Sequence, residues 1–145
     1  MGLAVEVVLD TNVAVSAAIS PKGSPAEIIK AWRAASFTWV TSPPLLRELE
    51  SGLHSPRLKR YITWSDDESR EFVALVRAVA RFVVPVSRID LIRADPADNR
   101  VLEAAVEGRV DYIVTGDHHL LGVGSHESIP IGTPARFVAV LATGP

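Results

Sequence analysis

The chain has 145 residues, a formal net charge of -2 and no cysteine. Its length fits a single domain built around one hydrophobic core. The charge excludes a protein that binds nucleic acid through an overall positive field, and the lack of cysteine excludes disulfides, thiolate metal sites and cysteine nucleophiles. Residues 2–9 carry no basic segment and are too short for a signal peptide or a membrane span. We therefore expect one domain over residues 1–145, located in the cytoplasm.

In the first half of the chain, strand and helix signals alternate. Residues 5–9 are almost all apolar and largely β-branched, which predicts a strand buried on both faces. Serine and proline at positions 24 and 25 are typical of a helix start, so we expect a helix over 24–35, followed by a strand over 37–40. A proline at 43 or 44 starts the next helix, whose leucines recur at helical spacing until Gly52 near its end.

The alternation continues in the second half. A capping-box pattern from Ser65 to Glu68 opens a long helix to about residue 80. In chain order we then expect a strand over 82–86, a helix over 96–107, a strand over 112–115, a short edge strand over 129–131 and a last helix from Thr133. This order predicts an α/β fold with three layers, α/β/α, around a central parallel sheet of four to five strands.

Four acidic residues are expected to meet at one edge of this sheet. Asp10 ends the first strand and Asp117 follows the fourth, and the carboxyl ends of parallel strands share an edge. Asp98 heads the apolar stripe of its helix, so its side chain should point inward. Glu48 lies in the second turn of the helix after the second strand, close enough to the same edge to join them.

Carboxylates gathered at a partly buried site repel one another and raise each other's pKa unless a cation compensates. Oxygen ligands favour Mg²⁺ or Mn²⁺, and two such ions roughly 3.5–4 Å apart could stabilise both the attacking and the leaving oxygen of a phosphodiester displacement. Simpler roles stay open for single residues. Asp10 and Asp95 could be helix caps, and Asp117 could serve only a turn.

Three segments together resemble the PIN-domain family of ribonucleases, in its VapC-like toxin branch. They are Val-Val-Leu-Asp-Thr-Asn at 7–12, Asp-Pro-Ala-Asp-Asn at 95–99 and Tyr-Ile-Val-Thr-Gly-Asp at 112–117. The resemblance assigns catalytic and metal-binding roles to four acids and supporting roles to two polar residues, which are Asp10, Glu48, Asp98 and Asp117, with Asn12 and Thr115.

The choice of Glu48 rests on this resemblance and not on periodicity. Glu48 and Glu50 flank the leucine stripe of their helix on opposite sides, so helical spacing cannot separate them. The family's Leu-x-Glu-Leu pattern matches residues 46–49 and favours Glu48, and Glu50 stays the alternative.

The resemblance implies a ribonuclease that depends on Mg²⁺ or Mn²⁺ and acts as the toxin of a type II toxin–antitoxin pair. RNA would be its substrate, an antitoxin its partner and a homodimer its form. The alternatives are a housekeeping RNA-processing nuclease of this fold, or a catalytically silent magnesium-binding module for partner binding or signalling. A haloacid-dehalogenase phosphatase would need an acid where Asn12 stands, and a receiver domain would need one at residues 84–86.

Two further groups are candidates for ligand contact. Arg57, Lys59, Arg60 and Tyr61 combine cations with an aromatic ring and are candidates for RNA contact, although a solvated charged surface is the simpler interpretation. His118 and His119 follow Asp117 and are candidates for metal or phosphate binding, against the simpler expectation of surface residues at a helix start.

Overall fold

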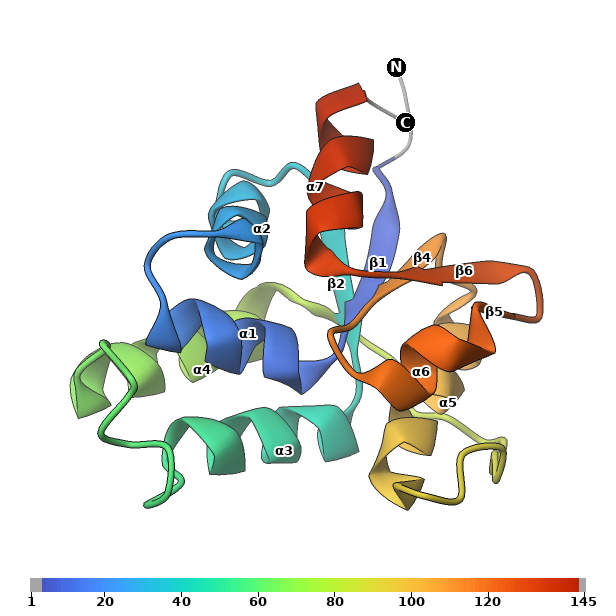
Figure 1. Ribbon diagram of the computed structural model, residues 1–145, viewed down its shortest axis with the longest axis horizontal. Coiled ribbons are helices and arrows are strands. Elements are labelled where there is room, and N and C mark those ends of the chain that lie inside the picture. The colour runs from blue at the N-terminus through green and yellow to red at the C-terminus, as the bar shows by residue number, and fades with distance from the viewer. Residues whose placement is uncertain (1–3, 144–145) are drawn as a thin grey trace.

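The computed structural model describes residues 4–143, so residues 1–3 and 144–145 of the expected domain lie outside the described residues. Helices and strands alternate along most of the chain (Figure 1). In chain order they are β1 (Glu6–Leu9), α1 (Thr11–Ile19), α2 (Ser24–Arg33), β2 (Thr38–Thr41), α3 (Pro43–Leu53), α4 (Asp66–Val79), β3 (Arg81–Phe82), the 3₁₀ turn η1 (Pro96–Asp98), α5 (Asn99–Gly108), β4 (Tyr112–Val114), α6 (His118–Val123), β5 (Ser125–His126), β6 (Ile129–Gly132) and α7 (Pro134–Thr143).

Within residues 4–143, six strands form one sheet in the order β3-β2-β1-β4-β6-β5. The first five of these pair in parallel, and β5 pairs antiparallel to β6. The expected α/β fold with a central parallel sheet is confirmed. The sheet gains one short strand, because the hairpin of β5 and β6 places β5 at the edge. The segment expected as an edge strand, β6, therefore lies between β4 and β5.

The central strands β1, β2 and β4 are buried on both faces, as their apolar sequences predict, whereas the edge strand β3 is exposed. Successive residues alternate between two hydrophobic cores: Val7 and Leu9 of β1 point into one core, and Val8 points into the other. The first core is filled mainly by α1, α2, α3, α4 and α7, and the second by α5 and α6. Figure 1 shows the sheet running between these two groups of helices, which confirms the three layers.

The strand order creates a switch point beside β1. From β1 the sheet continues to β2 on one side and to β4 on the other. In folds where the chain leaves two neighbouring strands in opposite directions, ligands bind at the carboxyl ends of those strands. Asp10 directly follows β1, and residues 115–117 directly follow β4, so both segments lie at this switch point.

Several elements differ from the sequence-based expectations. Helices α1 and α6 were considered only as possible helix starts after Asp10 and at His118, with no predicted extent, and strand β5 was not expected. Helix α2 is capped by Gly23, with Ser24 as its first helical residue. The strand expected over 82–86 is shortened to β3, since the chain leaves the sheet after Phe82 and exposes Val84 and Val86. Among the helices of residues 4–143, none combines the length and the apolar character that crossing a membrane requires.

Candidate metal centre

Asp10 and Thr115 join the ends of β1 and β4. The Thr115 hydroxyl donates a 2.7 Å hydrogen bond to Oδ2 of Asp10 and accepts a 2.9 Å bond from the backbone NH of Asp117. Thr115 is fully buried and Asp10 is 4% exposed. Asp10 occupies the N-cap position of α1, yet its side chain makes no capping hydrogen bond there. The structure thus confirms Asp10 at the cap position, while its side chain is directed to Thr115 and not to the start of the helix.

Glu48 reaches the same edge of the sheet from α3. Its Oε1 accepts a 2.8 Å hydrogen bond from the hydroxyl of Thr11, the residue after Asp10. Glu50 points elsewhere, because its Oε1 lies 3.6 Å from Nη2 of Arg77 on α4. Of the two glutamates that helical spacing left open, Glu48 is thus the one beside Asp10. Its catalytic role stays a prediction.

The other acids gather where α5 and α6 begin. Carboxylate oxygens of Asp95, Asp98 and Asp117 all lie within 4.8 Å of one another. Asp98 is buried, as its place on the apolar stripe predicts, although it ends the turn η1 and does not lie within α5. Asp95 accepts a bond from the NH of Ala97 as an N-cap, and Asp117 accepts bonds from the NH groups of His119 and Leu120 as the cap of α6. Asp95 and Asp117 therefore each cap a helical segment and also belong to the acidic group.

Burial and the neighbouring carboxylates shift the pKa values of the acids at this site. Burial raises the pKa of Asp10 to about 6, against the hydrogen bond from Thr115, and the charge of Glu48 adds to the increase. Burial also raises the pKa of Asp98 to about 7, reinforced by the charges of Asp117 and Asp95. Burial opposes ionisation of Asp117 too, but hydrogen bonds from the backbone NH groups of His119 and Leu120, together with its contacts to Asp98 and His119, lower its pKa. The pKa values of these two neighbouring acids are therefore shifted in opposite directions.

This arrangement fits a divalent cation. Oδ2 of Asp98 is buried and has no hydrogen-bond partner among residues 4–143, although it faces the other acids. An unpartnered buried carboxylate oxygen costs free energy that an ion ligand would recover. The donor set of carboxylate oxygens is the one that Mg²⁺ and Mn²⁺ prefer.

The comparisons with known proteins agree with this geometry. A family model described as a PIN domain matches residues 6–119, which include every acid of the site. The chain belongs to the PIN-domain family. It is also 27% identical over 142 residues to an uncharacterized protein from Methanocaldococcus jannaschii, and the match covers 92% of this chain and 90% of that protein. The toxin branch of the family is not identified by either match.

Of the other residues predicted to act in this PIN domain, Asn12 lies close to the acids and the candidates for RNA contact lie farther away. Asn12 is half-buried in the first turn of α1, directly beyond Thr11. The candidates for RNA contact lie in the segment between α3 and α4, which the NH and hydroxyl of Thr63 tie to the carbonyl of Ala18 at the far end of α1. The two helices α1 and α3 thus lead from the metal centre to this segment (Figure 1).

Within that segment the cations already have neighbours. Nζ of Lys59 lies 3.2 Å from Oδ2 of Asp66, and the guanidinium of Arg60 lies over the ring of Tyr61 at 4.7 Å. Arg57, Lys59, Arg60 and Tyr61 are all exposed. They are accessible to a ligand, and contact with RNA stays a prediction.

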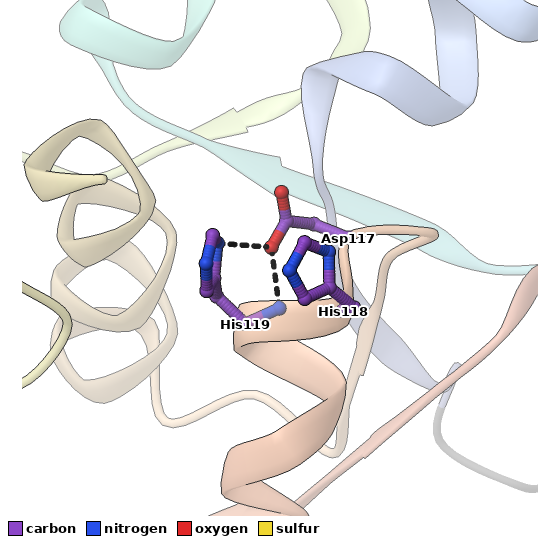
Figure 2. Close-up of side chains that lie close together, drawn as sticks. All are labelled: Asp117, His118 and His119. Carbon is purple, nitrogen blue, oxygen red and sulfur yellow. Dashed lines mark hydrogen bonds and ion pairs between the residues drawn. The ribbon is translucent and has the colours of Figure 1, made fainter. Parts of the chain in front are cut away.

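One residue of the PIN-domain site, Thr11, was not predicted from the sequence, and two others, Asp95 and His119, were considered with a simpler role preferred. Thr11 holds Glu48, but its hydroxyl carries no signal along the chain because its partner is distant in sequence. Asp95 was expected mainly as a cap, and the turn η1 brings it beside Asp98. His119 lies against Asp117, with its backbone NH and its ring both directed to the carboxylate (Figure 2).

Proposed function

We propose that this PIN domain is a ribonuclease that hydrolyses RNA phosphodiester bonds with Mg²⁺ or Mn²⁺, and that it serves as the toxin of a type II toxin–antitoxin pair. The observation that carries the proposal is the unpartnered Oδ2 of buried Asp98 beside Asp95 and Asp117, at the switch point of the sheet. Family membership supports a nuclease. RNA as substrate and the toxin role belong to the proposal.

In this proposal some residues hold the cation and others position those residues. Asp10, Asp98 and Asp117 would hold the cation, which when bound supplies positive charge to the phosphate undergoing attack. Thr115 fixes Asp10 through its hydroxyl, and the same oxygen anchors the backbone before Asp117. Glu48, exposed at the rim and held by Thr11, stands where it can accept a proton from the attacking water.

Single-stranded or looped RNA suits this site better than a rigid duplex, because a flexible backbone can bring its phosphate close to partly buried acids at the edge of the sheet. We place the continuing strand along α1 and α3, toward Arg57, Lys59, Arg60 and Tyr61. The antitoxin would cover this path, and the active protein would be a cytoplasmic homodimer.

Cleavage of a labelled single-stranded RNA by the purified protein tests the nuclease. We expect cleavage with Mn²⁺ or Mg²⁺, none in EDTA, and a loss of about 100-fold or more in Asp98→Asn. The variant, purified in the same way, controls for contaminating nucleases. Cleavage in EDTA, or equal rates for both proteins, would refute metal-dependent catalysis at this site. Metal binding without any cleavage would favour the silent partner-binding module.

Induced expression tests the toxin role separately. The wild-type protein should arrest growth, and Asp117→Asn should not. Co-expression of a small protein encoded beside the gene should restore growth if it is the antitoxin. A wild type that cleaves RNA in vitro and leaves growth unchanged would favour the housekeeping nuclease.

A further inference from the structure

The imidazole of His119 faces the acids of the candidate metal centre. Its Nδ1 lies 3.4 Å from Oδ1 of Asp117 and 3.8 Å from Oδ2 of Asp98. Figure 2 shows the ring beside the Asp117 carboxylate at the start of α6. Charge-assisted hydrogen bonds from nitrogen to carboxylate are usually about 2.7–2.9 Å long, so neither contact is a good one.

Both Nδ1 of His119 and Oδ2 of Asp98 are buried atoms with no hydrogen-bond partner in the part of the chain that the structure describes. Asp98 itself is only 8% exposed. Native proteins seldom leave two such atoms facing each other, because each loses its hydration without compensation. The pair therefore points to a ligand that both atoms contact.

A divalent ion satisfies both atoms at once. Ligand atoms that each lie about 2.1 Å from one ion, at right angles to one another, are about 3 Å apart, close to the separations seen between His119 and the two acids. We propose that Nδ1 of His119 is a nitrogen ligand of the ion that Asp98 and Asp117 hold. This inference rests on the metal site of the proposed function and adds a ligand to it.

The geometry selects His119 over its neighbour. His118 is exposed and stacks on the His119 ring, with the ring centres 4.0 Å apart. Its nitrogens lie near Asp117, but only the ring of His119 approaches both Asp98 and Asp117. His118 thus covers one side of the ligand ring, which makes it the matched control for His119.

A nitrogen ligand changes which ion the site prefers. Sites made only of carboxylate and water oxygens suit Mg²⁺ and Mn²⁺, whereas imidazole favours later metals such as Ni²⁺ and Zn²⁺. His119 should therefore tighten the binding of Ni²⁺ far more than that of Mg²⁺. The ratio of the two dissociation constants measures this contribution directly.

Calorimetric titration of the untagged protein with Ni²⁺ alone and Mg²⁺ alone tests the proposal. We expect His119→Ala to weaken Ni²⁺ binding by about tenfold or more, with a much smaller change for Mg²⁺. His119→Asn, which offers an amide oxygen close to the place of Nδ1, should keep Mg²⁺ binding and still lose affinity for Ni²⁺. His118→Ala should leave the ratio unchanged. Loss of Ni²⁺ binding in Asp98→Asn would locate the ion at this site, and unchanged binding would overturn the proposal.

The absorption spectrum of bound Co²⁺ gives a second readout, because its visible bands change when nitrogen is replaced by oxygen in the ligand set. Equal losses for Ni²⁺ and Mg²⁺ in His119→Ala, or a loss of preference in His118→Ala that matches it, would overturn the proposal. Normal Ni²⁺ and Mg²⁺ binding in every histidine variant would overturn it and leave the acidic metal site standing. A wild type that binds none of these ions would refute that site as well.

Discussion

The buried carboxylate of Asp10 lowers the folding stability of the protein when no cation is bound. A carboxyl group whose pKa rises from 3.8 to about 6 on folding costs about 3 kcal/mol of stability once it is ionised in both states. The cost is absent below about pH 4, grows as the pH rises toward 6, and stays constant above it. A bound cation would remove most of it by pairing with the charge.

We therefore expect Asp10→Asn to be more stable than the wild type in EDTA at pH 7.5, by about 1–3 kcal/mol. The asparagine oxygen can still accept the hydrogen bond from Thr115. At pH 4 the two proteins should be nearly equal in stability. Urea unfolding at both pH values gives the comparison. A variant that is less stable by the same amount at both would show that Asp10 carries no buried charge.

Glu48 and Glu50 form a matched pair on one helix. Glu48→Gln should lower kcat/KM for RNA by about 100-fold, because its carboxylate is held beside Asp10 by Thr11. Glu50→Gln should keep the wild-type rate and lose only the exposed ion pair with Arg77, which contributes at most about 1 kcal/mol. The opposite result in the two variants would make Glu50 the functional residue.

The residues differ in how far sequence alone could place them. Asp10 and Asp117 follow strands, so the topology of a parallel sheet fixes their common edge before any contact is known. Asp98 was placed by the apolar stripe that follows it. Glu48 could not be placed by helical spacing, since it depends on a hydrogen bond across 37 positions of the chain.

Among the elements, the segment before α5 shows how the irregular chain is held. Residues 83–95 contain no helix or strand, yet Oδ1 of Asn99 accepts hydrogen bonds from the NH groups of Leu91 and Ile92. Its Nδ2 donates to the carbonyls of Ile92 and Pro96. Asn99 is 1% exposed, and its buried side-chain amide holds the segment that leads to Asp95 and Asp98 through these hydrogen bonds.

Removal of the Asn99 side-chain amide should make both this segment and the acidic site less stable. We expect Asn99→Ala to lower the free energy of unfolding by about 2–4 kcal/mol, because buried backbone groups lose their partners. The amides of Leu91 and Ile92 should exchange with solvent faster, as hydrogen-exchange mass spectrometry can measure. The exposed Arg93→Ala is the control and should change neither quantity. Unchanged exchange in Asn99→Ala would show that the loop is held by other contacts.

Strand β6 passes close to β4 at Gly132. A Cβ atom added there would collide with the hydroxyl of Tyr112. Gly132→Ala should thus destabilise the protein by about 1–3 kcal/mol, since the strand or the ring must move. Gly122→Ala in α6, where a Cβ meets nothing within 4 Å, should be neutral or slightly stabilising. Thermal unfolding distinguishes the two, and equal melting temperatures would contradict this packing.

The sequence did not reveal the extent of some elements, and each case has a physical cause. Helix α1 reads Thr-Asn-Val-Ala-Val-Ser-Ala-Ala-Ile and packs between the sheet and other helices, so it lacks the polar stripe that marks a surface helix. Strand β5 has only two residues. Residues 82–86 are as apolar as a buried strand, but β3 is an edge strand and the chain departs from it after Phe82.

At the scale of the whole molecule, function follows from strand order. The sheet places β1 between β2 and β4, which brings Asp10 beside the turn after β4, and the turn η1 brings Asp98 beside Asp117 at the same edge. The layered fold was predictable because strand and helix signals alternate. The side-chain contacts among the acids were not, because they join residues from elements far apart in the chain.

Diffraction from crystals grown with Mn²⁺, collected near the manganese absorption edge, would locate the proposed ion. We expect an anomalous peak among the carboxylates of Asp10, Asp98 and Asp117, which disappears in Asp98→Asn crystals. A map without such a peak, from crystals in which these side chains are well ordered, would contradict it.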